Sequence, residues 1–413
     1  MEQLESYISY NKRHVYFLVF TFLITNQFFN LFIVDIHIWR ILNWAYSSWL
    51  ACYVLSCYLF KKIETYLVYK WAIILVFLSI VVCSFFYLSL CTNQTFSETF
   101  RVSISWFQLL LVFYLAYKEY SQKEIFDALK IFSFIWFTAW ILGFISPFPL
   151  YDASGEFDAN RLSNAGRGIL RLNISGNCLM HLWGLWCLSI YTTTFKKKYL
   201  VGYLLCLLFV LLCISRQHIL YYSTIGFLFL MYKIPNIKKI FLLLGLYITI
   251  AFVIPQTTIY QKTEQLTKAQ MKANGGGKND VRIKAATYYF TEFPQDFYTV
   301  LMGHGADHAH SEYGKKVKSI ILSHGYVMAD VGYASIYIKY GVLGLLCFGI
   351  LLIQVLRSKT INTNYGIKLF FVYTYLGNIF SHNIDLSMIG LALGLYVLLL
   401  DEYKITNELN NGV

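Results

Sequence analysis

The chain of 413 residues is 57% hydrophobic and only 14% charged, which lies outside the range of soluble globular domains. Apolar runs of about 16 to 22 residues recur along it, and this is the length needed to cross the hydrocarbon core of a bilayer. The formal net charge is +12, but the cations lie in short loops at the ends of the apolar runs. We therefore predict an all-α polytopic integral membrane protein and exclude nucleic acid as a partner.

The N-terminal residues and the cysteines add no competing signal. The segment Met1–Lys12 is polar, and no small-residue cleavage site follows the first apolar run, so we expect no cleaved signal peptide. Nearly all of the nine cysteines lie inside apolar runs, where they resemble small hydrophobic residues. Their spacing predicts neither a disulfide framework nor a metal site.

Charged breaks divide the apolar runs into about twelve predicted spans. They are expected near Val15–Val34, Ile41–Phe60, Trp71–Leu90, Val102–Tyr117, Ile131–Phe148, Ile174–Thr193, Leu200–Ile214, Ile219–Tyr232, Ile240–Pro255, Ile336–Val355, Leu369–Phe380 and Leu386–Leu400. The organisation is thus nine spans in residues 1–255, a large and partly helical loop over 256–335, and three spans with a polar tail in 336–413. The last two spans are short, and one interrupted helix is the alternative.

Lysine sets the predicted orientation. Lysines lie in alternate loops from Lys12 to Lys404, whereas the short loops on the other side contain none. By the positive-inside rule the lysine side is cytoplasmic, with both termini on it. The large loop is then external.

Arginine is distributed in the opposite way. Seven of the nine arginines fall on the predicted external side: Arg40, Arg101, Arg161, Arg167, Arg171, Arg216 and Arg282. The planar guanidinium suits bidentate binding of phosphate, which suggests an anionic substrate on this side. The alternative for any one of them is a side chain that only reaches the interface from a span end.

Arg216 is the strongest single candidate. It lies between two predicted spans of only about 15 residues, which reach roughly 22 Å at 1.5 Å per residue. Since the hydrocarbon core is about 30 Å thick, this hairpin tip is expected below the outer surface. A fixed charge there needs a wet cavity, an anionic ligand or an ion pair within the bundle.

The large loop contains one predicted helix, Asp280–Phe293. Asn279 or Asp280 would cap its start, and Pro294 would end it. Arg282 falls in its first turn, where the alternative to phosphate binding is a solvated charge.

Histidines and one aspartate supply further candidates. His304, His308 and His310 lie in GHGADHAH, but the flanking glycines prevent one helical face from presenting them, so we predict a sugar-facing loop and no metal. His324 and Asp330 precede the next span and are the candidate general bases. A solvated loop residue is the alternative for His324, and a helix N-cap is the alternative for Asp330.

The order of these features resembles the bacterial O-antigen polymerase and O-antigen ligase superfamily over about Leu200 to Leu400. The shared landmarks are a short span ending in Ser215-Arg216, a long external loop, the Arg282 helix, a Gly303-His304-Gly305 turn and a polar residue eleven positions before Gly341. In the ligase branch a histidine occupies the place of Asp330, which favours a polymerase here. The arginine–ten–glycine pattern of some polymerases is absent.

The resemblance implies a metal-independent, cofactor-free inverting glycosyl transfer at the outer face of the inner membrane. An undecaprenyl-diphosphate-linked oligosaccharide would be the substrate, with Arg216 and Arg282 on the diphosphate and Asp330 or His324 as base. Weaker glycan-binding candidates are Arg161, Arg167, Arg171, His304 and His382. A chain-length regulator is a further candidate partner.

Two other functions stay open at this stage. A ligase would pass finished glycan to lipid A core. A flippase for lipid-linked oligosaccharide would need charged groups along a path through the bundle, whereas the inner halves of the predicted spans are apolar.

Overall fold

The computed structural model describes residues 10–27, 35–60, 65–145, 175–212, 216–233, 280–294, 296–381 and 383–410, with isolated positions between 235 and 268. All regular structure in these ranges is helical. In chain order the elements are α1 (Lys12–Thr25), α2 (Ile36–Leu59), α3 (Thr65–Lys70), α4 (Ala72–Cys91), α5 (Phe96–Ser103), η2 (Ile104–Leu110), α6 (Leu111–Tyr117), α7 (Gln122–Ile145), α9 (Asn177–Thr194), α10 (Lys197–Leu212), α11 (Arg216–Lys233), α14 (Val281–Thr291), α15 (Phe297–Met302), α16 (Glu312–His324), η6 (Met328–Asp330), α17 (Gly332–Arg357), η7 (Asn362–Asn364), α18 (Tyr365–Gly377) and α19 (Met388–Asn410).

Every predicted span overlaps a described helix except 240–255, which lies outside the described residues. Within the described part of the chain, four helical segments are long and apolar enough to cross a membrane. These are Ala72–Cys91, Phe96–Tyr117, Gln122–Gly143 and Gly332–Arg357. That the remaining helices also cross, and that the large loop is external, stay predictions.

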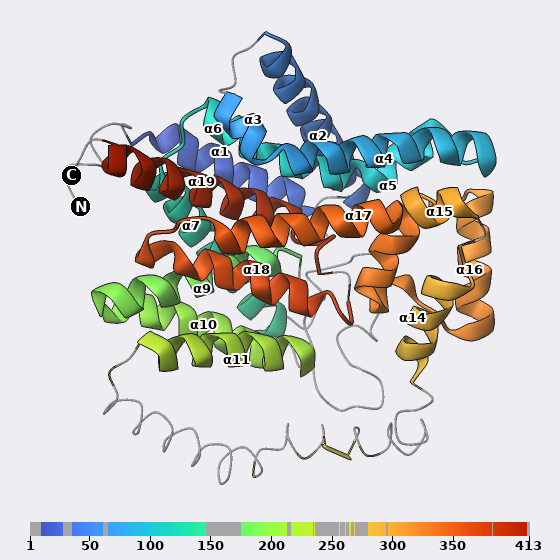
Figure 1. Cartoon of the computed structure of the whole chain (residues 1–413). Helices are drawn as coiled ribbons and strands as arrows, with labels where there is room; N and C mark the ends of the chain where they lie inside the picture. The colour runs from blue at the N-terminus through green and yellow to red at the C-terminus, as the bar shows by residue number, and fades with distance from the viewer. Residues whose placement is uncertain are drawn as a thin grey trace.

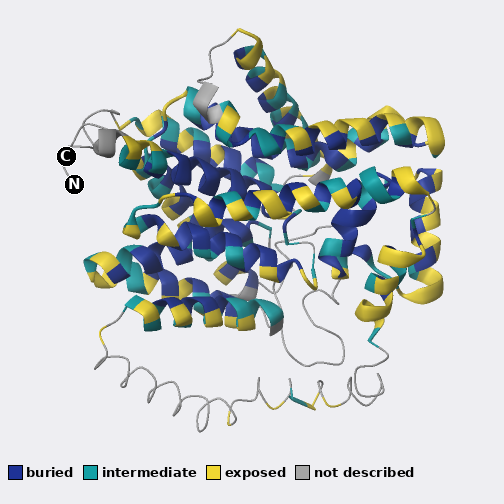
Figure 2. Cartoon of the chain, viewed as in Figure 1, coloured by how far each residue is buried: buried dark blue, intermediate teal, exposed yellow. Residues whose placement is uncertain are grey.

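The long helices pack side by side, with α4 and α18 each in contact with α17, and α18 in contact with α11 (Figure 1). The core lies along α9 and α19, and nearly every side chain of α19 between Leu391 and Leu399 is buried (Figure 2). Small residues allow helices to approach closely, as at the contact of α18 with α9, where a Cβ at Gly366 would lie 2.0 Å from the carbonyl oxygen of Leu185.

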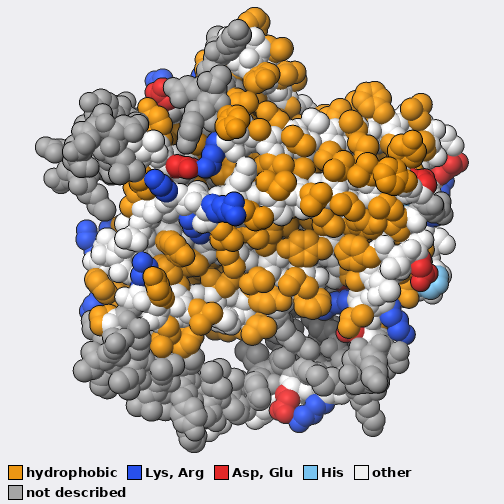
Figure 3. Space-filling model, viewed as in Figure 1, with side chains coloured by type: hydrophobic (Ala, Val, Ile, Leu, Met, Phe, Trp, Pro, Cys, Tyr) orange, Lys and Arg blue, Asp and Glu red, His pale blue; other side chains and the backbone are white. Residues whose placement is uncertain are grey.

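The outer helices expose apolar side chains. On α10 these are Val201, Leu204, Leu205, Leu208 and Leu211. Figure 3 shows a broad apolar belt over the middle of the bundle, with charged side chains towards its ends. A surface of this kind fits hydrocarbon as its solvent, which agrees with the membrane protein that the composition predicts.

Polar contacts tie the first and last described helices together at one end. Asp401 of α19 accepts hydrogen bonds from Gln122 Nε2 at 2.6 Å and Asn364 Nδ2 at 2.8 Å. Near Gln122, Glu124 accepts from the backbone N–H of Asn11. The end that carries α1's first turn therefore also carries the last turns of α19, and we call it the lysine end.

Two boundaries differ from those that the sequence predicts. The span expected from Val102 starts earlier, at Phe96, because Thr95 and Glu98 form a capping box. The span expected from Ile336 begins at Gly332 and is interrupted at Gly341, where φ is 65° and ψ is −165°. Helix α17 is thus two arms, and the first arm runs from Gly332 to Tyr340.

Candidate functional site

Helices α14, α15 and α16 form a cap at the end of the bundle opposite the lysine end (Figure 1). The cap has its own hydrophobic core, which includes the first arm of α17. Its buried members include Ala285, Tyr289, Phe293, Tyr313, Val317, Ile320, Val331, Ala334 and Ile338. Because one core unites the cap and this arm, the arm and the cap residues hold fixed positions relative to one another.

Arg282 lies in the first turn of α14 and is exposed. The helix begins as the sequence predicts, since the Asp280 side chain accepts a hydrogen bond from the Arg282 N–H at 2.8 Å. Helix α14 is held against the segment after α16 because Tyr289 Oη donates to the carbonyl oxygen of Tyr326 at 2.8 Å. The Arg282 guanidinium is therefore carried by a helix in a fixed position and is accessible to a ligand.

The two candidate bases, His324 and Asp330, are both exposed. His324 ends α16, where its Nδ1 lies 2.7 Å from Ser323 Oγ and its ring stacks 5.3 Å from that of Tyr326. Asp330 lies in η6 and does not cap α17, whose N-cap is Val331 without a side-chain bond. The capping role considered for Asp330 is therefore wrong, and its carboxylate is open.

The start of α17 meets the ends of two other helices. A Cβ at Gly332 would lie 2.1 Å from the carbonyl oxygen of Ser381 and 2.3 Å from that of Asn378. Gln217, in the first turn of α11, donates through Nε2 to Ser381 Oγ at 2.8 Å. We call this meeting of α11, α17 and the turn after α18 the rim. The rim brings Gln217, which follows Arg216, close to Gly332, which lies two residues after Asp330.

Several predicted site residues cannot be placed in this geometry. Arg216 begins α11, but its side chain lies outside the described residues. Arg161, Arg167, Arg171 and His382 also lie outside them. Their proposed roles in diphosphate and glycan binding stay predictions.

The sequence did not predict an ion pair that lies next to the rim. Lys339 Nζ lies 2.9 Å from Asp385 Oδ2, and the two side chains are 18% and 16% exposed. Lys339 lies near the end of the first arm of α17, and Asp385 lies in the turn between α18 and α19. A lysine inside an apolar span was the available signal, because such a charge needs a partner.

The turn after α15 packs against the break in α17 and supplies hydrogen bonds to the carbonyl oxygens there. The backbone N–H of His304 donates to the carbonyl oxygen of Ile338 at 2.6 Å. The backbone N–H of Gly305 donates to the carbonyl oxygen of Lys339 at 2.8 Å. The chains approach so closely that a Cβ at Gly303 would lie 2.4 Å from the Lys339 carbonyl carbon. The Gly303-His304-Gly305 motif therefore fixes the backbone at Lys339.

His304 is buried, and its ring packs 4.8 Å from that of Phe293 and stacks 6.1 Å from that of Tyr313. Burial, with a smaller contribution from Lys316, lowers its pKa to about 4. The ring is thus neutral near pH 7 and faces aromatic side chains. A glycan could reach it only if these rings moved apart.

The rest of the histidine run is held by Gln94, which is fully buried in the turn between α4 and α5. Its Oε1 accepts from the His308 N–H at 3.1 Å and from Ser311 Oγ at 2.8 Å. Its Nε2 donates to the Ala306 carbonyl oxygen at 2.9 Å. In the described part of the chain, no three His, Cys, Asp or Glu side chains are arranged to hold a metal ion.

A buried polar cluster lies beneath the rim, inside the bundle. Tyr373 Oη lies 2.6 Å from Nδ1 of His218 and 3.5 Å from Nε2 of His181. His181 of α9 is buried, and these neighbours are its contacts within the bundle. His218 follows Gln217 in α11, so polar groups continue inward from the rim.

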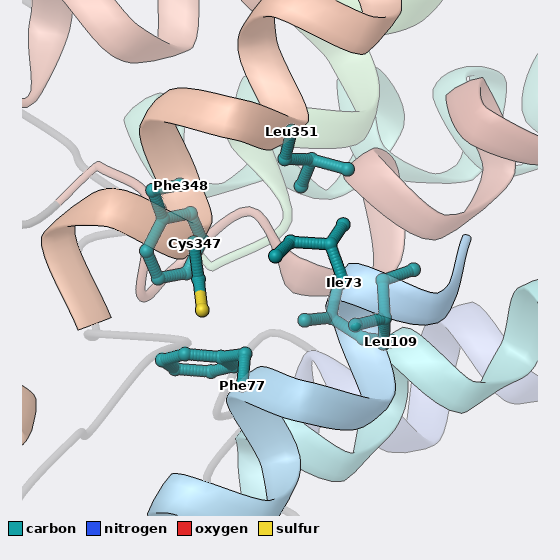
Figure 4. Close-up of a pocket in the computed structure, with 7 residues that line it drawn as sticks. Ile73, Phe77, Leu109, Cys347, Phe348 and Leu351 are labelled. Atoms are coloured by element: carbon teal, nitrogen blue, oxygen red, sulfur yellow. The ribbon is translucent and has the colours of Figure 1, made fainter. Parts of the chain in front are cut away.

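One hollow elsewhere in the bundle is apolar. It lies between α4, η2 and α17, and the labelled lining includes Phe77, Leu109 and Leu351 (Figure 4). Apart from the weakly donating thiol of Cys347, the side chains that line the hollow offer no hydrogen bond to a sugar or a phosphate. The polar groups of the cap and rim are the better candidate site.

The cap and rim combine an exposed arginine, two open groups that can accept a proton, and an ion pair at a helix break. Such a set can bind an anion, orient hydroxyl groups and remove a proton from one of them. No protein-family model matches this chain, and no curated protein matches it.

Proposed function

We propose that this protein is a polymerase of surface polysaccharide that acts at the outer face of the bacterial inner membrane. It transfers glycan from one undecaprenyl diphosphate onto the repeat unit carried by another. Its termini face the cytoplasm and its cap faces the periplasm. The observation that carries the proposal is that Arg282, His324 and Asp330 are exposed on neighbouring parts of the cap. The Arg282 helix contacts the segment that holds the other two, because Tyr288 stacks 6.3 Å from His324 and Tyr289 is bonded to Tyr326.

The chemistry fits this arrangement. A hydroxyl of the incoming lipid-linked repeat unit attacks the anomeric carbon of the growing chain, a new C–O bond forms, and the bond to the diphosphate breaks. Asp330 or His324 takes the hydroxyl proton, and the lipid diphosphate leaves with the bonding electron pair. Arg216 and Arg282 would stabilise the charge on that leaving group, so the step needs no general acid.

The test uses the purified full chain in liposomes with lipid-linked repeat units extracted from cells that lack the protein. A ladder of longer glycans on the lipid is the expected product. Arg282→Ala should slow it roughly ten- to hundredfold, which corresponds to one lost charge-assisted contact. Lys284→Ala is the matched control, because Lys284 is an exposed cation on the same helix. Equal rates for the wild type and Arg282→Ala would remove Arg282 from the site.

The same liposomes separate the other functions. A ligase lengthens no lipid-linked chain and instead loads lipid A core when this acceptor is added. A flippase changes the side of the membrane on which the glycan is found but forms no glycosidic bond.

A further inference from the structure

The Lys339–Asp385 ion pair has unused hydrogen-bonding capacity. The ammonium group has three N–H donors, and the structure shows one of them directed to Asp385 Oδ2 at 2.9 Å. Asp385 Oδ1 is buried and has no hydrogen-bond partner in the structure. Both side chains retain some exposure, at 18% and 16%, so a polar group of a ligand can contact the pair.

A second unsatisfied group lies in the same turn. Asn378 is fully buried, and its Nδ2 has no hydrogen-bond partner in the structure, although its Oδ1 accepts from the Ile384 N–H at 3.0 Å. The turn is fixed at this point, because Asn378 packs against Gly332 and Ser381 is bonded to Gln217. The turn that carries Asp385 is therefore held in one place against α11 and α17.

The backbone under the pair is equally fixed. The carbonyl oxygens of Ile338 and Lys339 are bonded to the N–H groups of His304 and Gly305, so Lys339 is held at the break in α17. Binding sites in membrane proteins recur where a helix is interrupted. The charge pair is thus prepositioned at a typical place for recognition.

The chemistry of the open groups selects the ligand. A phosphate only accepts hydrogen bonds, and the carboxylate of Asp385 would repel it. A sugar hydroxyl both donates and accepts, so neighbouring hydroxyls can donate to Asp385 and accept from Lys339. We propose that Lys339 and Asp385 form a subsite for the sugar that is attached to the lipid diphosphate. The subsite deepens the proposed function and rests on it for the identity of the lipid.

The test compares two ligands on the full chain in detergent by native mass spectrometry. The probes are undecaprenyl diphosphate and the lipid-linked repeat units extracted from cells that lack the protein. The wild type should bind the sugar-bearing lipid at least tenfold more tightly. Lys339→Met/Asp385→Leu should lose this preference and keep its affinity for undecaprenyl diphosphate.

The double variant is chosen because it leaves no unpaired charge. Each single substitution strands a charge and is expected to lower the melting temperature, whereas the double variant should melt near the wild type. The matched control is Lys70→Met/Glu402→Leu, which removes a similar ion pair at the lysine end. That pair has a 2.7 Å separation and 23% and 17% exposure, and its removal should not change the preference.

The outcomes separate the subsite from the proposed function. Equal binding of the two lipids by the wild type, or a preference that survives in the double variant, overturns the subsite. Sugar-dependent binding without polymerisation by the wild type supports the subsite and removes the polymerase. Polymerisation at the wild-type rate by the double variant retains the polymerase and removes the subsite.

Discussion

Gln94 offers the sharpest test of how the cap is held. We consider Gln94→Met, which keeps the length of the side chain but removes its donor and acceptor. The His308 N–H and the Ala306 carbonyl oxygen would lose the bonds of 3.1 Å and 2.9 Å that Gln94 supplies. Ser311 Oγ would keep its 2.8 Å bond to the His308 carbonyl oxygen, and Thr99 Oγ1 would keep its bond to Thr95.

The magnitude follows from the two backbone groups left without a partner. Each such group costs about 1–3 kcal/mol when buried, so the local opening free energy should fall by about 2–6 kcal/mol. Since about 1.4 kcal/mol is a factor of ten, the His308 amide should exchange with solvent deuterium at least about 30-fold faster.

Hydrogen–deuterium exchange read by mass spectrometry measures this directly. The amides of His304 and Gly305 serve as an internal reference, because they are bonded to α17 and not to Gln94. Asn93→Gly is the control for the neighbouring position, since Asn93 has φ 53° and its side chain makes an exposed bond to Glu312. The reasoning is refuted if His308 exchanges equally fast in the wild type and in Gln94→Met.

Three other predictions concern pH, the helix break and the candidate base. The pKa of His304 is lowered to about 4 by burial and Lys316, against the nearby Asp296, so the unfolded chain binds more protons between about pH 6.5 and 4. The stability from its neutral ring is complete above pH 6.5 and should fall by up to about 3 kcal/mol as the pH drops to 4. Melting curves should show this loss in the wild type and a smaller one in His304→Phe; parallel curves would contradict the prediction. Gly341→Ala should cost about 1–3 kcal/mol, because the backbone there is left-handed and the new Cβ would lie 2.2 Å from the Leu301 carbonyl oxygen. Gly349→Ala on the same helix meets no atom within 4 Å and should not lower the melting temperature, so equal melting of the two variants would be the contrary result. Asp330→Asn should reduce the polymerisation rate roughly 10²–10⁴-fold if Asp330 is the base, with no change in melting temperature. Loss of rate in His324→Gln but not in Asp330→Asn would assign the base to His324.

Much of the fold could be predicted because a bilayer limits what a chain can do. Apolar runs separated by charges must form helices there, and helices occur at the predicted ranges within the described part of the chain. The start of α14 was also predictable, because Asp280 offers a local capping signal. These signals need no knowledge of distant contacts.

The helix break and its ion pair follow from contacts between distant parts of the chain. Gly341 sits in an apolar run that predicts an unbroken span, and only its contact with Leu301 shows why the backbone must turn there. Lys339 and Asp385 are 46 positions apart, and nothing local pairs them. His304 was expected to face sugar because its neighbours in the sequence are polar and small. In the structure its ring is instead covered by those of Phe293 and Tyr313, which are not its immediate neighbours in the sequence.

The two hydrogen bonds between the turn after α15 and α17 limit how a substrate can enter. Swinging α15 aside would strip the carbonyl oxygens of Ile338 and Lys339 of their partners in a region of low dielectric constant. We therefore expect α15 to stay bonded to α17 and not to swing open for a substrate. A substrate that binds at the rim would therefore have to enter without displacing α15.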